Sequence, residues 1–488
     1  MIHMDHVTFT YKSEAAGGVR DIDLTIPEGQ VVVLCGESGC GKTTVTRLIN
    51  GLIPHYFEGE LTGSVHVDGK DVARQPLWDT ARQVGSVFQN PRSQFFNVDT
   101  TSEITFGCEN LGMPRDEILE RLAHTVSALK LEKLLDRSIF ELSGGEKQKI
   151  ACAGAFMMVP QVFVLDEPSS NLDADAILDL RQVTAYLKSL GKTVVLSEHR
   201  LYYLQGVADR YIYMQDGVIR GDYTQAELDR IPDEERRAMG LRAASLSALT
   251  AGGSTGSRQT AALRDFRFAY KNAPETLHIG DADIPYGGII GIIGHNGAGK
   301  STFSRCFCGL EKRCGTVTVD GTAFRPKERL NRCYMVMQDV GHQLFTESVL
   351  DEVLISMADE DEAAARAILA RLDLTPYLER HPASLSGGQK QRLAIASAMA
   401  AERSVVFLDE PTSGLDYRHM LQTAQLLKEL RQNGKTVYVI THDPELICQC
   451  CTDILHLEAG RIAESFPMDQ DGAEKIRRFF RTDDTVCI

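Results

Sequence analysis

A glycine-rich loop that follows an apolar segment occurs twice in this chain. The first copy, GESGCGKTT, begins at Gly36, and the second, GHNGAGKST, begins at Gly294. Both fit the pattern G-x-x-x-x-G-K-[S/T], whose glycines let backbone N–H groups close around phosphate oxygens at the start of a helix. Two such loops, each after a short apolar segment, predict two phosphate-binding α/β domains on one chain.

Further motifs repeat in the same order. LSGGE begins at Leu142 and LSGGQ at Leu385, while VFVLDEP ends at Pro168 and VVFLDEP ends at Pro411. The later motifs have a constant separation between their two copies, and it is slightly smaller than the separation of the two loops. The chain therefore contains a duplicated domain, with fewer residues between the early and later motifs of the second copy.

In each copy, apolar segments of strand length alternate with helical segments. This pattern predicts the α/β class, with a mainly parallel sheet covered by helices on both faces. Each copy opens with a β-rich part and has a more helical middle. The expected boundaries are residues 1–240 for the first domain, 241–260 for a Gly/Ser-rich linker containing LSALTAGGSTGSRQT, and 261–488 for the second domain.

The composition limits the classes of function. The formal net charge of −15 argues against a general nucleic-acid binder, which needs a basic surface. No apolar run reaches the roughly 18 residues that span a bilayer, and we expect no signal peptide. The 12 cysteines lack metal-binding spacings, so we expect reduced thiols; oxidation of Cys40, inside the first loop, would inhibit nucleotide binding.

The two loops supply the first candidates for binding nucleotide phosphates. Lys42 and Lys300 are placed to reach the β- and γ-phosphates, and the Thr43 and Ser301 hydroxyls to bind magnesium. The complete set is Gly36, Glu37, Ser38, Gly39, Cys40, Gly41, Lys42, Thr43 and Thr44 in the first copy, and Gly294, His295, Asn296, Gly297, Ala298, Gly299, Lys300, Ser301 and Thr302 in the second.

Acidic pairs at the ends of two apolar strands supply the catalytic candidates. Asp166 and Asp409 are expected to hold Mg²⁺, directly or through water. The neighbouring carboxylates, Glu167 and Glu410, are placed to polarise the attacking water. A charged pair at the carboxyl end of a strand lies at the ligand edge of such a sheet, and the two phosphate loops favour this interpretation over an ordinary surface strand end.

Three pairs of residues at matched positions complete the candidates. His199 and His442 follow the acidic pairs at one separation and are expected to contact the γ-phosphate. The middle glutamines are able to orient water or magnesium, and one tyrosine before each loop is a candidate to stack on adenine, although a core tyrosine of an edge strand is a rival interpretation. These residues are Gln89 and Gln338, and Tyr11 and Tyr270.

The LSGGE and LSGGQ segments resemble the signature of ATP-binding cassette (ABC) ATPases, and the resemblance covers nearly the whole chain. It implies two tandem P-loop NTPase domains, each with a helical signature subdomain, that pair head to tail around ATP and Mg²⁺. One site would combine Lys42, Gln89, Asp166, Glu167 and His199 with Ser386, Gly387 and Gly388. The other would combine Lys300, Gln338, Asp409, Glu410 and His442 with Ser143, Gly144 and Gly145.

The same resemblance assigns Asp173 and Asp416 to the loops that link the two sites. Both copies retain the lysine, glutamate and histidine, so two hydrolysing sites are expected. The one departure, Glu146 where the second copy has Gln389, leaves open that the two sites are unequal.

The segment VFQNPRSQFFNVDTTSEITFGCENLGMP is similar to the ATPases of energy-coupling factor (ECF) importers, and MQDVGHQLFTESVLDEV echoes it. Both contain a second glutamine, a phenylalanine and an acidic residue at matched spacings, namely Gln94, Phe96 and Glu103, and Gln343, Phe345 and Glu352. In that family this region faces a membrane partner, so Phe95 and Phe96 are candidates for contact with a helix. Buried core positions are the alternative.

This second resemblance implies the motor of an importer at the cytoplasmic face of the cell membrane. Its partners would be a transmembrane scaffold (T) subunit and a small membrane substrate-binding (S) subunit, and its cargo a vitamin, a vitamin precursor, or nickel or cobalt. Two alternatives are another double-cassette importer, such as a sugar importer, and a soluble ABC-F-type ribosome factor. The short Gly/Ser-rich linker and the acidic charge argue against the latter.

Overall fold

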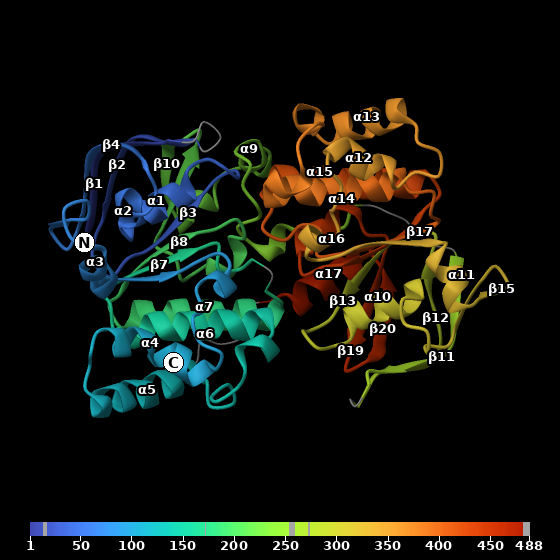
Figure 1. Cartoon of the computed structure of the whole chain (residues 1–488), viewed down its shortest axis with the longest axis horizontal. Coiled ribbons are helices and arrows are strands. Elements are labelled where there is room, and N and C mark those ends of the chain that lie inside the picture. The colour runs from blue at the N-terminus through green and yellow to red at the C-terminus, as the bar shows by residue number, and fades with distance from the viewer. Residues whose placement is uncertain (13–16, 171, 253–258, 272–273, 482–488) are drawn as a thin grey trace. The chain divides into compact units, whose positions relative to one another are not determined.

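The computed structural model describes residues 1–12, 17–170, 172–252, 259–271 and 274–481 (Figure 1). The chain forms two compact units, Met1–Ser245 and Leu246–Arg481. Within the described residues, no helix has both the length and the apolar character needed to cross a membrane.

The first unit contains two sheets. The antiparallel sheet has the order β2-β1-β4-β5 and the central sheet the order β10-β9-β3-β8-β7-β6, in which only the β9–β10 pair is antiparallel. The strands are β1 Ile2–Tyr11, β2 Gly18–Ile26, β3 Val31–Cys35, β4 Gly59–Val67, β5 Lys70–Asp71, β6 Val84–Val87, β7 Val162–Asp166, β8 Thr193–Ser197, β9 Arg210–Gln215 and β10 Val218–Thr224.

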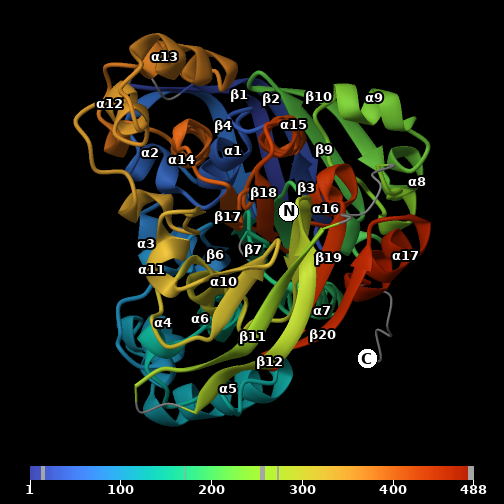
Figure 2. The ribbon, with the colours of Figure 1, turned by 90° about the vertical axis from the view of Figure 1, so that its right-hand side faces the viewer.

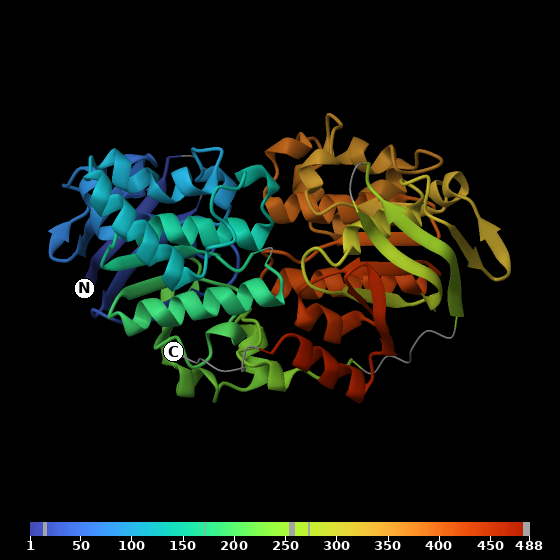
Figure 3. The same cartoon turned by 90° about the horizontal axis from the view of Figure 1, so that it is seen from below.

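Helices surround these sheets. They are α1 Lys42–Ile49, α2 Leu52–His55, α3 Leu77–Gln83, α4 Thr100–Asn110, α5 Arg115–Leu129, α6 Gly144–Met157, α7 Ala174–Ser189, α8 Gln225–Leu228 and α9 Asp233–Ala238, with 3-10 turns at Pro91–Ser93, Ile139–Glu141 and Tyr202–Leu204. α4, α5 and α6 pack on one another and form the helical subdomain, the cyan and teal ribbons of Figure 3. The signature segment LSGGE therefore opens a helix of this subdomain.

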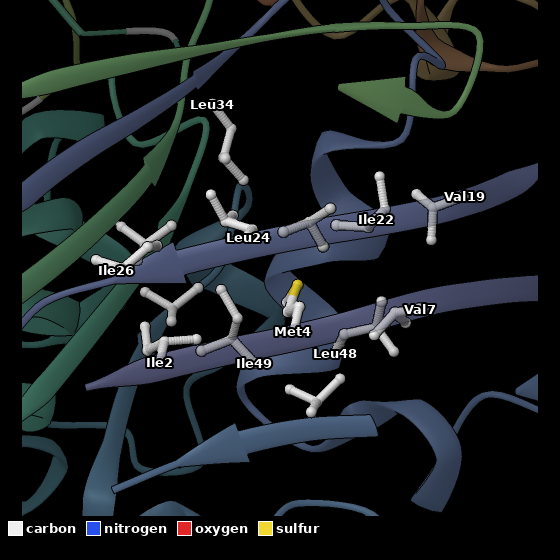
Figure 4. Close-up of a cluster of buried hydrophobic side chains, with 14 of the residues drawn as sticks. Ile2, Met4, Val7, Val19, Ile22, Leu24, Ile26, Leu34, Leu48 and Ile49 are labelled. Atoms are coloured by element: carbon white, nitrogen blue, oxygen red, sulfur yellow. The ribbon is translucent and has the colours of Figure 1, made fainter. Parts of the chain in front are cut away.

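The core of the first unit joins the antiparallel sheet to the helix that follows the phosphate loop. The inward side chains of β1 and β2, such as Met4 and Ile22, are buried with Leu48 and Ile49 of α1 (Figure 4). Alternating apolar residues give β1 and β2 one buried face. Every residue of β3 is buried, as expected for a central strand covered on both faces.

The second unit repeats this architecture. Its antiparallel sheet has the order β12-β11-β14-β15 and lies beside α10 (Figure 2), and its central sheet has the order β16-β17-β18-β13-β19-β20. The strands are β11 Gln259–Ala269, β12 Glu275–Tyr286, β13 Ile289–Ile293, β14 Thr316–Val319, β15 Thr322–Phe324, β16 Cys333–Val336, β17 Val405–Asp409, β18 Thr436–Ile440, β19 Asp453–Glu458 and β20 Arg461–Pro467.

The helices of the second unit largely follow the order of the first, although a helix at Pro444–Cys450 occupies the place of the 3-10 turn Tyr202–Leu204. They are α10 Lys300–Cys308, α11 Pro326–Leu330, α12 Val349–Leu354, α13 Glu362–Arg371, α14 Gly387–Ala400, α15 Tyr417–Gln432, α16 Pro444–Cys450 and α17 Gln470–Phe479, with 3-10 turns at Leu246–Ala248, Val340–His342, Thr375–Tyr377 and Pro382–Ser384. The predicted fold class, with a mainly parallel core sheet, a β-rich subdomain and a helical subdomain in each copy, is confirmed.

Described residues at both ends of the predicted linker, 241–260, belong to the compact units, and the linker bounds remain a prediction. Leu241 is buried, and its carbonyl accepts a hydrogen bond from Arg236, so the first unit continues to Ser245. At the other end, the Leu249 carbonyl accepts from Arg477 of α17, and residues 259–260 begin β11. Residues 253–258 lie outside the described part of the chain.

Candidate functional site

Each phosphate loop connects a central strand to the helix after it, β3 to α1 and β13 to α10. The first glycines, Gly36 and Gly294, have φ of 143° and 148°. A Cβ at Gly36 would lie 2.2 Å from the Met214 carbonyl oxygen, and one at Gly294 would lie 2.1 Å from that of Leu457. Glycine is therefore required in both loops because the neighbouring strand passes so close.

The two lysines are buried inside their loops. Lys42 Nζ donates to the carbonyl oxygens of Gly36 and Glu37 at 3.0 and 2.9 Å. Lys300 Nζ donates to those of Gly294 and His295 at 2.6 and 3.0 Å. Both ammonium groups thus lie at the centre of a loop whose backbone is shaped to surround phosphate oxygens.

A hydroxyl and a carboxylate meet next to each lysine. Thr43 Oγ1 donates to Asp166 Oδ1 at 3.1 Å, and Ser301 Oγ donates to Asp409 Oδ2 at 2.9 Å. Burial raises the pKa of both carboxyl groups. Mg²⁺ is usually bound by one or two protein oxygens together with nucleotide phosphates, so this pair of oxygens fits a magnesium ion.

The glutamate after each of these aspartates faces a histidine. His199 Nε2 lies 3.3 Å from Glu167 Oε1, and His442 Nε2 lies 3.6 Å from Glu410 Oε1. Both glutamates have positive φ, 43° and 51°, which is uncommon for residues other than glycine. The same strained backbone in two independent copies is typical of a functional site.

The middle glutamines occupy matching positions with different contacts. Gln89 Nε2 donates to Glu167 Oε2 at 2.6 Å, so the structure brings the predicted glutamine and glutamate together. Gln338 is exposed in the turn after β16. The predicted magnesium role of these two side chains remains a prediction.

The two tyrosines adjoin the phosphate loops. The hydroxyl of Tyr11 lies 3.3 Å from Thr44 Oγ1, and that of Tyr270 lies 3.3 Å from Thr302 Oγ1. A cavity of about 640 Å³ in the first unit is lined by Tyr11 together with phosphate-loop residues and Glu167. Tyr11 also packs against the hydrophobic core of the first unit, so its role in stacking on adenine remains a prediction.

Comparison with known proteins decides the family. A sequence model described as ABC transporter matches residues 19–170 and 277–413. A putative ABC transporter ATP-binding protein of Treponema denticola is 44% identical, with 95% of this chain and 96% of that protein aligned. A protein of the same description from Methanosarcina mazei is 31% identical, with 95% of this chain and 88% of that protein aligned. The chain belongs to the ABC transporter family.

As a member of this family the chain is an ATPase that binds and hydrolyses ATP, with Mg²⁺ as the usual cofactor. Its two units are ABC cassettes, the first cassette being Met1–Ser245 and the second Leu246–Arg481. Among solved structures, the archaeal ribosome recycling factor aABCE1, in complex with the ribosomal stalk protein aP1, has a TM-score of 0.66 and 22% identity, covering 97% of this chain and 92% of that one. This likeness shows the shared fold alone.

The ABC signature residues begin a helix in each cassette. Ser143 caps α6 and Ser386 caps α14, and each forms a capping box with the third residue of the helix, Glu146 or Gln389. Glu146 also pairs with Arg137 at 2.8 Å. Glu146, which stands where the second cassette has Gln389, therefore preserves the cap at the start of the helix. The glycines Gly144, Gly145, Gly387 and Gly388 form the first turns.

The loops after the acidic pairs also end in helix caps. Asp173 accepts a hydrogen bond from Ala176 N and begins α7, and Asp416 accepts one from His419 N and begins α15. The neighbouring Asn171 lies outside the described residues.

Two features of the sites were missed by sequence reasoning. Glu198, which precedes the first histidine, is buried and accepts hydrogen bonds from Ser169 N, Ser169 Oγ and Tyr203. In the second cassette Asp443, which follows the histidine, accepts from Thr412. The signal was present in the sequence as SEHR against THDP, a carboxylate on opposite sides of the histidine.

The second missed feature is the pair Arg47 and Phe57, which line the cavity beside Tyr11. Arginine occurs five positions after the loop lysine in both copies, and this repetition is the signal that could have found it; the contact with Phe57 has no such signal.

Proposed function

We propose that this chain is the ATPase motor of an ECF-type importer. The observation that carries the proposal is a loop built in the same way in both cassettes, which displays an aromatic side chain to solvent. Phe96 is 76% exposed and Phe345 is 71% exposed. Large exposed aromatic side chains at matched positions favour binding to a partner protein.

The acidic residue of the ECF-like segment holds this loop. Glu103 Oε2 accepts from the backbone N–H groups of Phe96 and Asn97 at 3.0 and 2.8 Å. Glu352 Oε2 accepts from those of Phe345 and Thr346, both at 3.0 Å. These buried carboxylates explain why an acidic residue occurs at a fixed spacing after the phenylalanine.

The second glutamine of the segment fixes the other end of the loop. Gln94 accepts from Phe88 N and donates to the Ser86 carbonyl, at 3.2 and 2.9 Å. Gln343 makes the equivalent bonds with Met337 N and the Met335 carbonyl, both at 3.1 Å. The residues that carry the resemblance are thus the scaffold of a display loop. Phe95 is half-buried and Phe96 is exposed, so in this proposal Phe96 is the residue that contacts the partner.

An apolar hollow adjoins this loop in the second cassette. It has a volume of about 420 Å³, and its lining includes Leu310, Leu330, Met337, Phe345 and Ile355. Its largely apolar lining suits the apolar face of a short amphipathic helix. We assign this hollow to a cytoplasmic helix of the transmembrane scaffold subunit, whose partner would be a small substrate-binding membrane subunit. The chain would then act at the cytoplasmic face of the membrane.

In this proposal ATP is bound between a phosphate loop of one cassette and the signature serine and glycines of the other. Lys42 and Lys300 bind the β- and γ-phosphates, and the buried aspartates and loop hydroxyls hold Mg²⁺. Glu167 and Glu410 polarise water, while His199 and His442 contact the γ-phosphate. ATP binding closes the cassettes and hydrolysis opens them, which moves the membrane subunits and imports a micronutrient: a vitamin, a vitamin precursor, nickel or cobalt.

The experiment is purification of the tagged chain from its host in mild detergent, followed by mass spectrometry. A multi-span scaffold protein together with a small, very hydrophobic protein is the expected result. Ribosomal proteins without a membrane partner would contradict the proposal and favour the ribosome-factor alternative. Two large membrane subunits with an external binding protein would favour another importer class.

A matched pair of variants tests the display loop. Phe96→Ser combined with Phe345→Ser is expected to lower recovery of the membrane subunits by about tenfold or more, because aromatic anchors dominate such interfaces. Leu190→Ser, which changes a 45% exposed apolar residue after α7, serves as the control. Equal recovery with the double variant and the control would rule out the assigned role of the loop.

A further inference from the structure

The base-side walls of the two nucleotide sites are built differently. In the first cassette, Arg47 Nη1 donates to the Tyr11 hydroxyl at 2.9 Å, and the guanidinium carbon lies 4.0 Å from the centre of the Phe57 ring. The Tyr11 and Phe57 rings meet edge to face at 6.1 Å. All three side chains line the cavity that also contains Lys42 and Glu167. We call Tyr11, Arg47 and Phe57 the cation–aromatic platform.

In the second cassette the equivalent arginine, Arg305, is bound by a carboxylate instead of aromatic rings. Arg305 donates through Nε and Nη2 to Glu311 Oε1, at 3.1 and 2.9 Å. Tyr270 packs edge to face on Phe268, with 4.9 Å between ring centres, as Tyr11 does on Phe9 at 4.8 Å, and Tyr270 is 41% exposed. The same arginine in the same position of the repeat is thus committed to a carboxylate in one copy and to aromatic rings in the other.

The difference originates in the strand that follows the phosphate-loop helix. β4 has 9 residues, and its first residue, Gly59, pairs with Tyr11 of β1. β14 has 4 residues, and its pairing with β11 covers Ala261 to Arg264 only. The longer strand brings the segment containing Phe57 to the tyrosine, whereas the shorter strand ends before it would reach Tyr270.

A guanidinium whose carbon lies 4.0 Å from the centre of an aromatic ring is suited to a planar, electron-rich ligand. It stacks on π systems and donates hydrogen bonds at its edge, as arginine does with nucleobases. Because Arg47 is already held by Tyr11 and Phe57 at the wall of the cavity, little further ordering of this side chain is needed when a base binds there.

We propose that Arg47 and Phe57 are base-binding residues that give the first cassette the tighter subsite for the base of a purine nucleotide. The second cassette, whose arginine is paired with Glu311, binds nucleotide mainly through the phosphate loop. The inference depends on the assignment of the nucleotide site and is independent of the importer role.

The test compares ADP with pyrophosphate, which has the same phosphate pair without the nucleoside, by calorimetry in the presence of Mg²⁺. The full chain is used with Lys300→Ala in every sample, so that binding reports on the first site, or with Lys42→Ala, so that it reports on the second. The first site is expected to bind ADP severalfold more tightly than the second, with similar affinities for pyrophosphate. Equal ADP affinities, or a tighter second site, would overturn the proposal.

Substitutions then locate the difference. Arg47→Met and Phe57→Leu are each expected to weaken ADP binding at the first site by about fivefold, the scale of one cation–aromatic contact, and to leave pyrophosphate binding unchanged. Arg47→Lys keeps the charge without the planar group and should restore only part of the affinity. Arg305→Met is the matched control at the second site and is expected to change neither affinity.

Loss of ADP and pyrophosphate binding together in Arg47→Met would show a role in the phosphate loop or in folding and would refute the base-binding role. An unchanged ADP affinity, or an equal loss in Arg305→Met, would refute it as well. Thermal unfolding of each variant identifies misfolding, and Phe57→Leu, which retains an apolar side chain, keeps the proposal testable if Arg47→Met does not fold.

Discussion

At the residue scale, the two cassettes fix the loop after the acidic pair with carboxylates on opposite sides of the histidine. Glu198 accepts from Ser169 in the first cassette, and Asp443 accepts from Thr412 in the second. Glu198 also accepts from the backbone N–H of His199 at 3.0 Å. Each carboxylate therefore links the histidine segment to the loop that carries the next motif.

Glu198→Gln should lower both stability and ATPase activity. The amide NH₂ would face backbone N–H donors that now donate to a carboxylate, and an unsatisfied buried donor costs about 1–3 kcal/mol. Denaturant unfolding and steady-state ATPase assays measure the two effects. Asp443→Asn is the matched change in the second cassette, and we expect a similar direction there. A Glu198→Gln protein with unaltered stability and turnover would contradict this role.

We expect replacement of the buried Asp409 by asparagine to increase stability, by an amount that depends on pH. Burial raises the pKa of Asp409, so its favourable contribution is present below the unfolded-state pKa and is lost as pH rises through the folded-state pKa. The asparagine of Asp409→Asn can still accept a hydrogen bond from Ser301. It has no carboxyl group, so its contribution to stability does not fall as the pH rises. Without nucleotide or Mg²⁺, the variant should unfold at a higher temperature than the parent at pH 8, by about 2–4 °C for each kcal/mol gained.

The difference in unfolding temperature between Asp409→Asn and the parent protein should be smaller at pH 5, because a larger fraction of the Asp409 carboxyl is then protonated. Differential scanning calorimetry at the two pH values measures both differences. The exposed Asp320→Asn is the control and should show neither gain. A gain that grows on acidification would be inconsistent with a raised pKa for Asp409 in the folded protein.

At the scale of elements, the display loop before α12 depends on one buried carboxylate. Glu352 accepts from Phe345 N, Thr346 N and Thr346 Oγ1, the last at 2.8 Å. Glu352→Ala should lower the free energy of unfolding by about 1–3 kcal/mol and speed amide hydrogen exchange in residues 343–348. Urea unfolding and hydrogen-exchange mass spectrometry measure the two effects. The exposed Glu347→Ala should do neither, and equal exchange in the two variants would count against this support.

The elements that carry the motifs were predictable because their sequence signals are local. β3, β7 and β8 are short apolar runs, fully or almost fully buried, and each leads into a loop whose residues sequence reasoning had singled out. Arg47 and Phe57 were not predictable in this way, since their meeting depends on how far β4 extends along β1. Glu198 was overlooked because a glutamate is normally expected at the surface, and the hydrogen-bond donors that allow it to be buried are visible only in the structure.

At the scale of the whole molecule, the duplication puts two complete sets of candidate residues on one chain. The hydrogen-bond distances of the loop lysine and the aspartate, and the glutamate–histidine distance, agree between the cassettes within a few tenths of an ångström. That similarity could be predicted from the repeated motifs. The linker bounds remain a prediction, and composition alone gave no sign that Leu241 and Leu249 are buried.

Two working sites predict that each glutamate is needed. Glu167→Gln and Glu410→Gln should each reduce ATPase activity to below about half, since losing a general base slows its own site by about 10² or more. Steady-state phosphate release measures activity, and retained ADP binding shows that each variant is folded. Near-full activity in either single variant would indicate that only the other site hydrolyses ATP.

Because a strand passes so close to each phosphate loop, a glycine-to-alanine substitution there is a way to block nucleotide binding in one cassette only. A single methyl group at Gly36 or Gly294 meets a backbone carbonyl at about 2 Å, without any change of charge in the site. Because both halves belong to one polypeptide, every molecule made from such a gene would be blocked on the same side. A purified sample would therefore contain a single species, in which one nucleotide site is blocked and the other is intact, with no mixture of intact and altered subunits.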